Sequence, residues 1–209
     1  MNFFRAIAAF CVSSIGKKII VAVTGLGLLL FLAGHLAGNL LIFHPDGPDA
    51  INSYAEELKH LLHGSFVWIA RAGLLTFFVL HIWFTVLLTK ENRAAREQRY
   101  EHGKTIQASK ASRTMILSGL VILAFVIYHL LHYTLLVTHP EFADFHDAEG
   151  RHDVYKMVVT GFENTGIAIF YIVAVGLLCL HLSHGFASVF QTLGLRSERT
   201  ALVLSLIHI

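Results

Sequence analysis

Four apolar runs, each long enough to cross a lipid bilayer, constrain this chain more than any other feature of its sequence. They cover about residues 18–43, 66–89, 114–137 and 162–190, and a fifth run begins near Thr200 and stops at Ile209. A transmembrane helix needs about 20 residues to cross a hydrocarbon core of about 30 Å. Four runs meet that length and the fifth is cut short. We therefore predict an all-α membrane bundle, one domain over residues 1–209, with four complete transmembrane helices and a truncated fifth.

The distribution of charge predicts how this bundle is oriented. Only 14% of the residues are charged, against about 25% in a typical soluble domain. If the N-terminus and residues 90–113 and 191–200 lie on one side of the membrane, that side holds twelve of the sixteen lysines and arginines. The positive-inside rule makes this side cytoplasmic. We therefore expect a cytoplasmic N-terminus, with the acidic, histidine-rich segments 44–65 and 139–161 outside.

The two ends of the chain are expected to differ from the bundle. Apolar side chains recur at helical spacing before the first span: Phe3, Phe4, Ile7, Phe10 and Cys11. Residues 1–16 are therefore expected to form an interfacial helix on the bilayer, with a frayed terminus as the alternative. At the other end, LSLIHI resembles the translation of a sequencing-library adapter. We expect a truncated reading frame, in which residues 204–209 are non-native.

Several chemistries are excluded by what the sequence lacks. Its two cysteines, Cys11 and Cys179, are isolated, so there is neither a C-x-x-C-H motif for covalent haem nor a cysteine cluster for iron–sulfur or zinc. The chain has no glycine-rich nucleotide-binding loop and no nucleophile constellation, and nothing indicates a nucleic-acid partner. Its chemistry must therefore come from other side chains within the spans.

Each of the four complete spans contains at least one histidine. A polar side chain in hydrocarbon is costly and usually marks a function. Depth can be measured from the predicted span ends at about 1.5 Å per residue. His35 and His132 then lie about 10–12 Å below the outer boundary, while His81 and His184 lie a similar distance from the inner one. The spans hold the following histidines: His35, His81, His129, His132, His181 and His184.

Two imidazoles from different helices at one depth are the arrangement that binds a haem iron from both sides. Because both axial positions are then filled, such a haem transfers electrons and binds no substrate. A histidine that only packs and hydrogen bonds is the alternative at each position. The third span holds His129 and His132, and the fourth holds His181 and His184. Residues three apart share a helix face, so spacing alone does not decide which histidine of each pair would bind the iron. The glycines of the G-x-x-x-G frame around His35 fit either close helix packing or clearance for a porphyrin.

Four segments of the chain look like those of a known membrane family: SSIGKKIIVAVTGLGLLLFLAGHLAGNL, NSYAEELKHLLHG, LHYTLLVTHPEF and HLSHGFASVFQTLGL. The likeness covers nearly the whole chain. It resembles the cytochrome b subunit of succinate:quinone oxidoreductases, in the form with one five-helix anchor polypeptide and two b-type haems. The resemblance implies that His35 and His132 hold the outer haem and that His81 and His184 hold the inner one.

The resemblance also implies a function and partners. In that family a flavoprotein subunit with covalent FAD oxidises succinate or reduces fumarate, and an iron–sulfur subunit connects it to the cytochrome. This chain would be a non-dehydrogenase subunit in the cytoplasmic membrane of a bacterium, exchanging electrons with quinone, usually menaquinone, among membrane lipids. The basic segments 93–113 and 196–199 would dock the soluble subunits, with solvated charge as the alternative. Whole complexes are also expected to associate as homo-oligomers.

A quinone site near the outer haem is a further expectation. Relatives have an acidic residue at the outer end of the second helix, because quinone chemistry needs proton donors and acceptors. Four residues occupy that neighbourhood here: Glu56, Glu57, His60 and His63. A polar surface helix over residues 50–63 is the alternative. Arg71, at the outer start of the second span, would either pair with a haem propionate or snorkel to the interface.

Two other functions fit the same pattern. A diheme cytochrome b could anchor a different dehydrogenase, such as a hydrogenase or a formate dehydrogenase, and the soluble partner would then change. Membrane histidines could instead form the proton relay of a transporter that holds no haem. A b-type absorption band in the purified protein would indicate a cytochrome, and its absence would favour the transporter. Nickel or molybdenum in the co-purified subunits would indicate a dehydrogenase other than succinate dehydrogenase.

Overall fold

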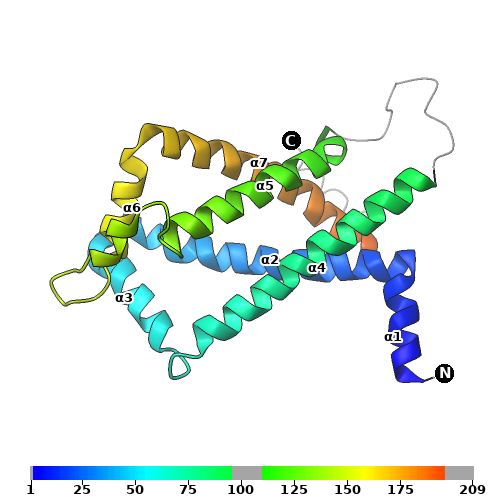
Figure 1. Ribbon diagram of the computed structural model, residues 1–209, viewed down its shortest axis with the longest axis horizontal. Helices are drawn as coiled ribbons and strands as arrows, with labels where there is room; N and C mark the ends of the chain where they lie inside the picture. Colours follow the sequence, from blue (N-terminus) through cyan, green and yellow to red (C-terminus); the bar gives the residue numbers. More distant parts are fainter. Residues whose placement is uncertain (1, 96–109, 196–209) are drawn as a thin grey trace. The chain divides into compact units, whose positions relative to one another are not determined.

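The computed structural model describes residues 2–95 and 110–195, and within them the chain is helical with no β-strand (Figure 1). Seven α-helices and two 3₁₀ helices, η1 and η2, make up this described part. In chain order they are α1 (Phe3–Val12), α2 (Ser14–Asn39), η1 (Leu40–Phe43), α3 (Gly47–His60), α4 (Phe66–Ala94), α5 (Lys110–Tyr133), η2 (Pro140–Asp144), α6 (Val154–Glu163) and α7 (Thr165–Thr192).

The four predicted spans are confirmed as helices long and apolar enough to cross a membrane. They cover Ser14–Phe43, where η1 continues α2, then Phe66–Ala94, Thr114–Tyr133 and Thr165–Thr192, and each has a window of mean hydropathy 2.0 or more. By length and composition this is a multi-pass membrane protein. The expected fifth span lies at 196–209, outside the described residues. The cytoplasmic location of the N-terminus stays a prediction.

The third span ends earlier than its apolar pattern predicts. Hydropathy extends the run to about residue 137, but α5 ends at Tyr133. The chain then passes through Leu136, whose φ of 52° lies in the left-handed region that side chains with a Cβ rarely adopt. The Val137 N–H donates back to the Leu131 carbonyl (2.8 Å). His132 therefore sits in the last turn of the helix, and the depth expected for it in the membrane stays a prediction.

A helix forms at the N-terminus, as the sequence predicts. The residue after α1, Ser13, is extended (ψ 146°) and so ends that helix. Its Oγ accepts a hydrogen bond from the Gly16 N–H (3.0 Å) and thereby caps the start of α2. The apolar side chains of α1 are exposed, Phe3 by 74% and Phe4 by 81%. The placement of α1 on the bilayer surface stays a prediction.

Backbone contacts group the chain into two compact units, each assembled from segments far apart in the sequence. The first unit contains Met1–Phe31, Ala72–Arg113 and Leu182–Ile209. The second contains Leu32–Arg71 and Thr114–His181. Helices α2, α4 and α7 each contribute residues to both units, so neither unit is a continuous stretch of sequence.

In the first unit, α2 approaches α4 closely at two glycines. A Cβ added to Gly27 would lie 2.3 Å from the Phe77 ring, and one added to Gly25 would lie 3.1 Å from Cε1 of His81. Any other residue at position 27 would therefore displace the Phe77 ring or the helix that carries it. Near the start of α2, the ammonium of Lys17 pairs with the carboxylate of Glu91 at the end of α4. Glycine contact and ion pair together fix how α4 lies along α2.

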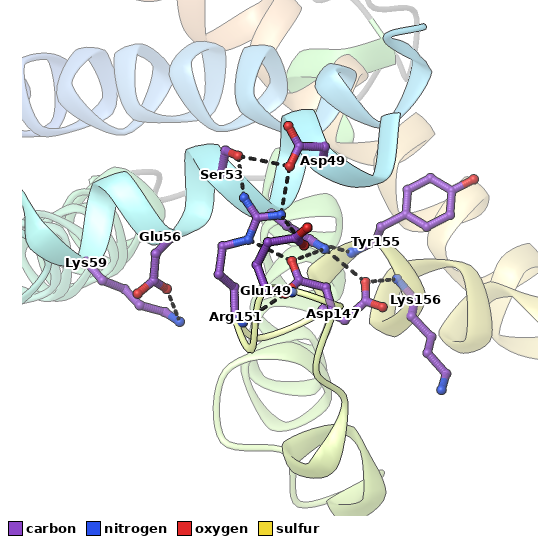
Figure 2. A network of polar contacts seen from close by, with 11 residues as sticks. Asp49, Ser53, Glu56, Lys59, Asp147, Glu149, Arg151, Tyr155 and Lys156 are labelled. Atoms are coloured by element: carbon purple, nitrogen blue, oxygen red, sulfur yellow. Dashed lines mark hydrogen bonds and ion pairs between the residues drawn. The ribbon is translucent and has the colours of Figure 1, made fainter. Parts of the chain in front are cut away.

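In the second unit, α3 lies beside α6, and both contact the loop of residues 144–153 (Figure 1). We call this assembly of α3, the loop and α6 the polar cap. Arg151 stands at its centre (Figure 2). Its guanidinium donates to Asp49 (2.7 Å), Ser53 (2.6 Å) and Asp147 (2.7 Å). Two of these bonds, to Asp49 and Ser53, join the loop to α3, and the third, to Asp147, lies within the loop.

Asn52 is the buried counterpart of Arg151 in the polar cap. It is 2% exposed, and its amide donates to Asp147 (3.3 Å) and to Asp153 (3.2 Å). Its Oδ1 accepts from the Tyr155 N–H (3.0 Å) at the start of α6. Because every polar atom of this buried amide has a partner, its burial stabilises the cap rather than opposing it.

The carboxyl of Asp147 is ionised over the physiological range. Burial acts to raise its pKa, but hydrogen bonds from Arg151 and Asn52 and the guanidinium charge together lower that pKa below its ordinary value. A lowered folded-state pKa means that this group stabilises the fold above its unfolded pKa. That contribution is lost as the pH falls through the lower, folded-state pKa.

Replacing Asn52 should open the polar cap without disturbing the spans. In Asn52→Ala, the Tyr155 N–H and the two carboxylates each lose a partner, and a buried polar group left unsatisfied costs about 1–3 kcal/mol. We expect faster amide hydrogen exchange over residues 47–60 and 144–163, measured by mass spectrometry. The matched control is Asn92→Ala, at an exposed position near the end of α4. Unchanged exchange in the cap of Asn52→Ala would contradict this role.

Candidate functional site

His35 of α2 and His129 of α5 face one another in the second unit. Their ring centroids lie 5.9 Å apart, and the ring planes are nearly perpendicular at 83°. Each histidine lies four residues before the last residue of its own helix, Asn39 or Tyr133. The structure therefore brings together two imidazoles from two spanning helices. From the sequence, His132 had been predicted at this place.

His132 lies one turn further along α5 and is enclosed by protein. Its side chain is fully buried, and its ring stacks on Tyr133 at 3.9 Å and 27°. Nδ1 lies 3.1 Å from the hydroxyl of Tyr171. Among the described residues Nε2 has no hydrogen-bond partner, and it faces Gly161, where an added Cβ would lie 3.2 Å away. Neither ring nitrogen points into open space.

Tyr171 of α7 connects the two histidines of α5. Its hydroxyl lies 3.1 Å from Nδ1 of His132 and 3.5 Å from Nδ1 of His129. The ring is 8% exposed and packs edge-on against Phe125 and Phe162, each with a centroid distance of 5.0 Å. The sequence analysis missed this residue. A tyrosine in an apolar span was the available signal, because a buried phenol needs a hydrogen-bond partner.

His81 of α4 is anchored through one ring nitrogen in the first unit. Nδ1 lies 3.2 Å from the Val21 carbonyl and 3.3 Å from the Thr24 hydroxyl. Because a carbonyl only accepts, Nδ1 carries the proton, and Nε2 of the neutral ring keeps its lone pair. Metal-binding histidines commonly donate their other N–H to such an acceptor. The state of His81 therefore suits a metal ligand.

The two histidines of α7 fall in different units. His184 belongs to the first unit, as does His81, whereas His181 ends the second. Nδ1 of His181 lies 3.1 Å from the Ser118 hydroxyl of α5. The backbone carbonyl of His184 accepts from Ser188 (2.9 Å). The predicted pairing of His81 with His184 thus joins two residues of one unit, and it stays a prediction.

The expected quinone residues lie on α3 and in the turn that follows it. Glu56 accepts hydrogen bonds from His60 (2.9 Å) and Lys59 (3.2 Å), and these bonds lower the pKa of its carboxyl. Figure 2 shows Glu56 and Lys59 side by side on α3. His63 has a φ of 55°, in the turn between α3 and α4. These contacts are those of a polar surface helix, and the quinone role of Glu56, Glu57, His60 and His63 stays a prediction.

Arg71 and the G-x-x-x-G glycines have distinct surroundings. The guanidinium of Arg71 lies 5.1 Å from the centre of the Trp68 ring one turn earlier in α4, a cation–π contact. A Cβ on Gly38 would lie 2.6 Å from the Tyr54 ring, whereas one on Gly34 would have no neighbour within 4 Å. Gly38 thus allows α3 to pack closely, and Gly34, next to His35, borders open space.

No cluster of three or more metal-binding side chains occurs in residues 2–95 and 110–195. A site built from protein ligands alone, such as tetrahedral zinc, needs such a cluster. A haem supplies four of the iron's ligands itself, so two imidazoles complete its coordination.

Comparison with protein-family models, curated proteins and solved structures found no match to this chain. The family resemblance accordingly rests on the quoted segments, and function is argued from the side chains themselves.

Gly161 should be required for the enclosure of His132. A Cβ there would lie 2.4 Å from the Tyr133 hydroxyl, so Gly161→Ala must displace Tyr133 or α6. Overpacking of this kind typically costs about 1–3 kcal/mol. We expect a lower thermal midpoint for Gly161→Ala in detergent. Gly176→Ala in α7 is the control, because a Cβ there has no neighbour within 4 Å. Equal midpoints for the two variants would contradict the close contact.

Proposed function

We propose that this chain is the membrane-anchor cytochrome b subunit of a succinate:quinone oxidoreductase and holds two b-type haems between its spanning helices. The observation that carries the proposal is the pair of facing imidazoles, His35 and His129. When bound, the haems would relay electrons between the iron–sulfur subunit and quinone. The resemblance of the sequence supplies the identity of the complex.

The separation of His35 and His129 fits ligation of one iron from both sides. Metal–imidazole bonds are about 2 Å long, so two rings on opposite sides of an iron have their centres about 6 Å apart. The observed separation is 5.9 Å. Edge-to-face packing of two rings gives similar distances. Histidines within apolar spans usually mark a function, and this favours the metal.

We assign His129, in place of His132, as the partner of His35. His129 faces His35 across 5.9 Å between ring centroids. His132 has Nδ1 against Tyr171, and its Nε2 lies toward Gly161 of α6. The family motif implies His132, so this assignment departs from the resemblance and can be tested separately from it.

The second haem would be held by His81 and a histidine of α7. The contact of Nδ1 with Val21 leaves Nε2 of His81 ready to bind iron. The resemblance implies His184 as the partner. His181 has the Nδ1 hydrogen bond to Ser118 that metal-bound histidines commonly make. Both α7 histidines therefore enter the mutational test.

The remaining parts of the proposal follow from the sequence. By the excess of lysine and arginine, the N-terminus and residues 90–113 would lie in the cytoplasm, and the flavoprotein and iron–sulfur subunits would dock on 93–113 and 196–199. The polar cap would then face outward. Quinone, dissolved in the bilayer, would exchange electrons at the haem near that face. The host would be the cytoplasmic membrane of a bacterium.

The first test is a haem count on the complex purified from membranes. A pyridine haemochrome assay should give two b-type haems per chain, together with a co-purified FAD subunit and an iron–sulfur subunit. Co-purified nickel or molybdenum proteins would assign the chain to a different dehydrogenase. A complex without any b-type absorption band would contradict the cytochrome proposal and would favour the histidine-relay transporter.

Single histidine variants should separate the two haems. We expect His35→Ala and His129→Ala to lose the same haem, because each removes one of its two axial ligands, and His132→Ala to keep both. His81→Ala and His184→Ala should lose the other haem, with His181→Ala as the matched comparison on α7. Redox-difference spectra of each complex identify the haem that is lost. Loss of a haem from His132→Ala but not from His129→Ala would overturn the assignment of His129.

A further inference from the structure

We infer that Thr24 and Gly25 of α2 are positioning residues for the haem bound by His81, and that they act on the imidazole of this ligand; this inference rests on the proposed function. The Thr24 hydroxyl lies 3.3 Å from Nδ1 of His81, and the Val21 carbonyl lies 3.2 Å from the same nitrogen. All four residues belong to the first unit. One turn of α2 thus supplies both acceptors for the ring nitrogen that would remain free of iron.

The direction of the bond between Thr24 and His81 follows from the other contacts of the hydroxyl. Thr24 is 4% exposed, and its Oγ1 donates to the Ile20 carbonyl (2.7 Å), a bond that threonines commonly make within helices. Because its single hydrogen is used there, the oxygen meets His81 with a lone pair and accepts from the Nδ1–H. The contact with Ile20 already satisfies the hydroxyl as a donor, so the contact with His81 is additional to what packing of the helix requires.

Gly25 allows the imidazole to reach these acceptors. A Cβ at this position would lie 3.1 Å from Cε1 and 3.4 Å from Nδ1 of His81. The shorter distance is below the optimum of about 3.5–4.0 Å between carbon atoms, so an alanine here would push the ring away from α2. Val21 lies four residues before Gly25 on the same face of the helix. The approach of the ring to the Val21 carbonyl therefore depends on the missing side chain.

The expected consequence is a lower reduction potential for one haem. Acceptors that draw on the Nδ1 proton make an imidazole a stronger donor to iron through Nε2. A stronger donor stabilises the oxidised form of the iron, and hydrogen bonding around the ligands is one of the levers that set haem potentials. The effect should be confined to one haem, because the Thr24 hydroxyl bonds to His81, a ligand of that haem alone.

The test is an optical redox titration of the purified complex carrying Thr24→Val, which keeps the branched shape and removes the hydroxyl. We expect two haems, a raised midpoint potential for the haem that His81→Ala loses, and an unchanged potential for the other. Thr24→Ser keeps the hydroxyl and should retain the wild-type potential. The matched control is Thr76→Val, since Thr76 also donates to a carbonyl of its own helix (2.8 Å) but at an exposed position. Unchanged potentials in Thr24→Val with full haem content would overturn the inference.

A second variant decides the matter if Thr24→Val assembles without this haem. Gly25→Ala should raise the potential of the same haem, because the ring moves away from both acceptors. Gly73→Ala in α4 is its control, since a Cβ there has no neighbour within 4 Å. Loss of this haem from Thr24→Val but not from Thr24→Ser would also support the inference, whereas its loss from both would overturn the role of the hydroxyl.

Failure of the proposed function has a different signature. A wild-type complex without haem would refute that function, and a His81→Ala complex with both haems would refute the assignment of His81 as a ligand. Full haem content in the wild type, one haem lost from His81→Ala and unchanged potentials in Thr24→Val and Gly25→Ala would refute the present inference alone.

Discussion

Polar groups inside the apolar helices must find partners within the protein, and this constraint governs the arrangement of every buried histidine described above. Water is absent from a bilayer core, so an imidazole that cannot hydrogen bond or bind a metal destabilises the helix that carries it. His81 meets the requirement through a backbone carbonyl of α2. His132 meets it through a phenol of α7. His129 and His35 face one another, and Nδ1 of His129 lies 3.5 Å from the hydroxyl of Tyr171.

The same constraint explains which features the sequence could predict. The spans follow from hydropathy alone, because length and apolarity are what a bilayer selects. The helix at residues 3–12 follows from apolar spacing. The end of α5 could not be predicted, since residues 134–137 are apolar enough to continue a helix. The turn there depends on Leu136 adopting a left-handed conformation that its side chain disfavours.

The choice between His129 and His132 shows the limit most clearly. The two residues are three apart on one helix face, so sequence spacing cannot separate them. Matched depth, measured from the expected span ends at Phe43 and His139, favoured His132. That His129 is the residue facing His35 is a tertiary contact, which spacing along the chain cannot give. The enclosure of His132 by Gly161 and Tyr171 depends on α6 and α7, which lie far away in the sequence. The contacts of the polar cap were missed for the same reason.

The polar cap has a consequence for how the protein is made. Asp49 and Ser53 leave the ribosome about a hundred residues before Arg151, and α4 and α5 are synthesised between them. The guanidinium can reach its carboxylates only if this intervening pair of helices has inserted as a hairpin, with both ends on one face of the membrane. A helix pair threaded the wrong way would leave Arg151 and Asp49 on opposite faces. The contacts of Arg151 with α3 are therefore compatible with only one threading of the α4–α5 pair.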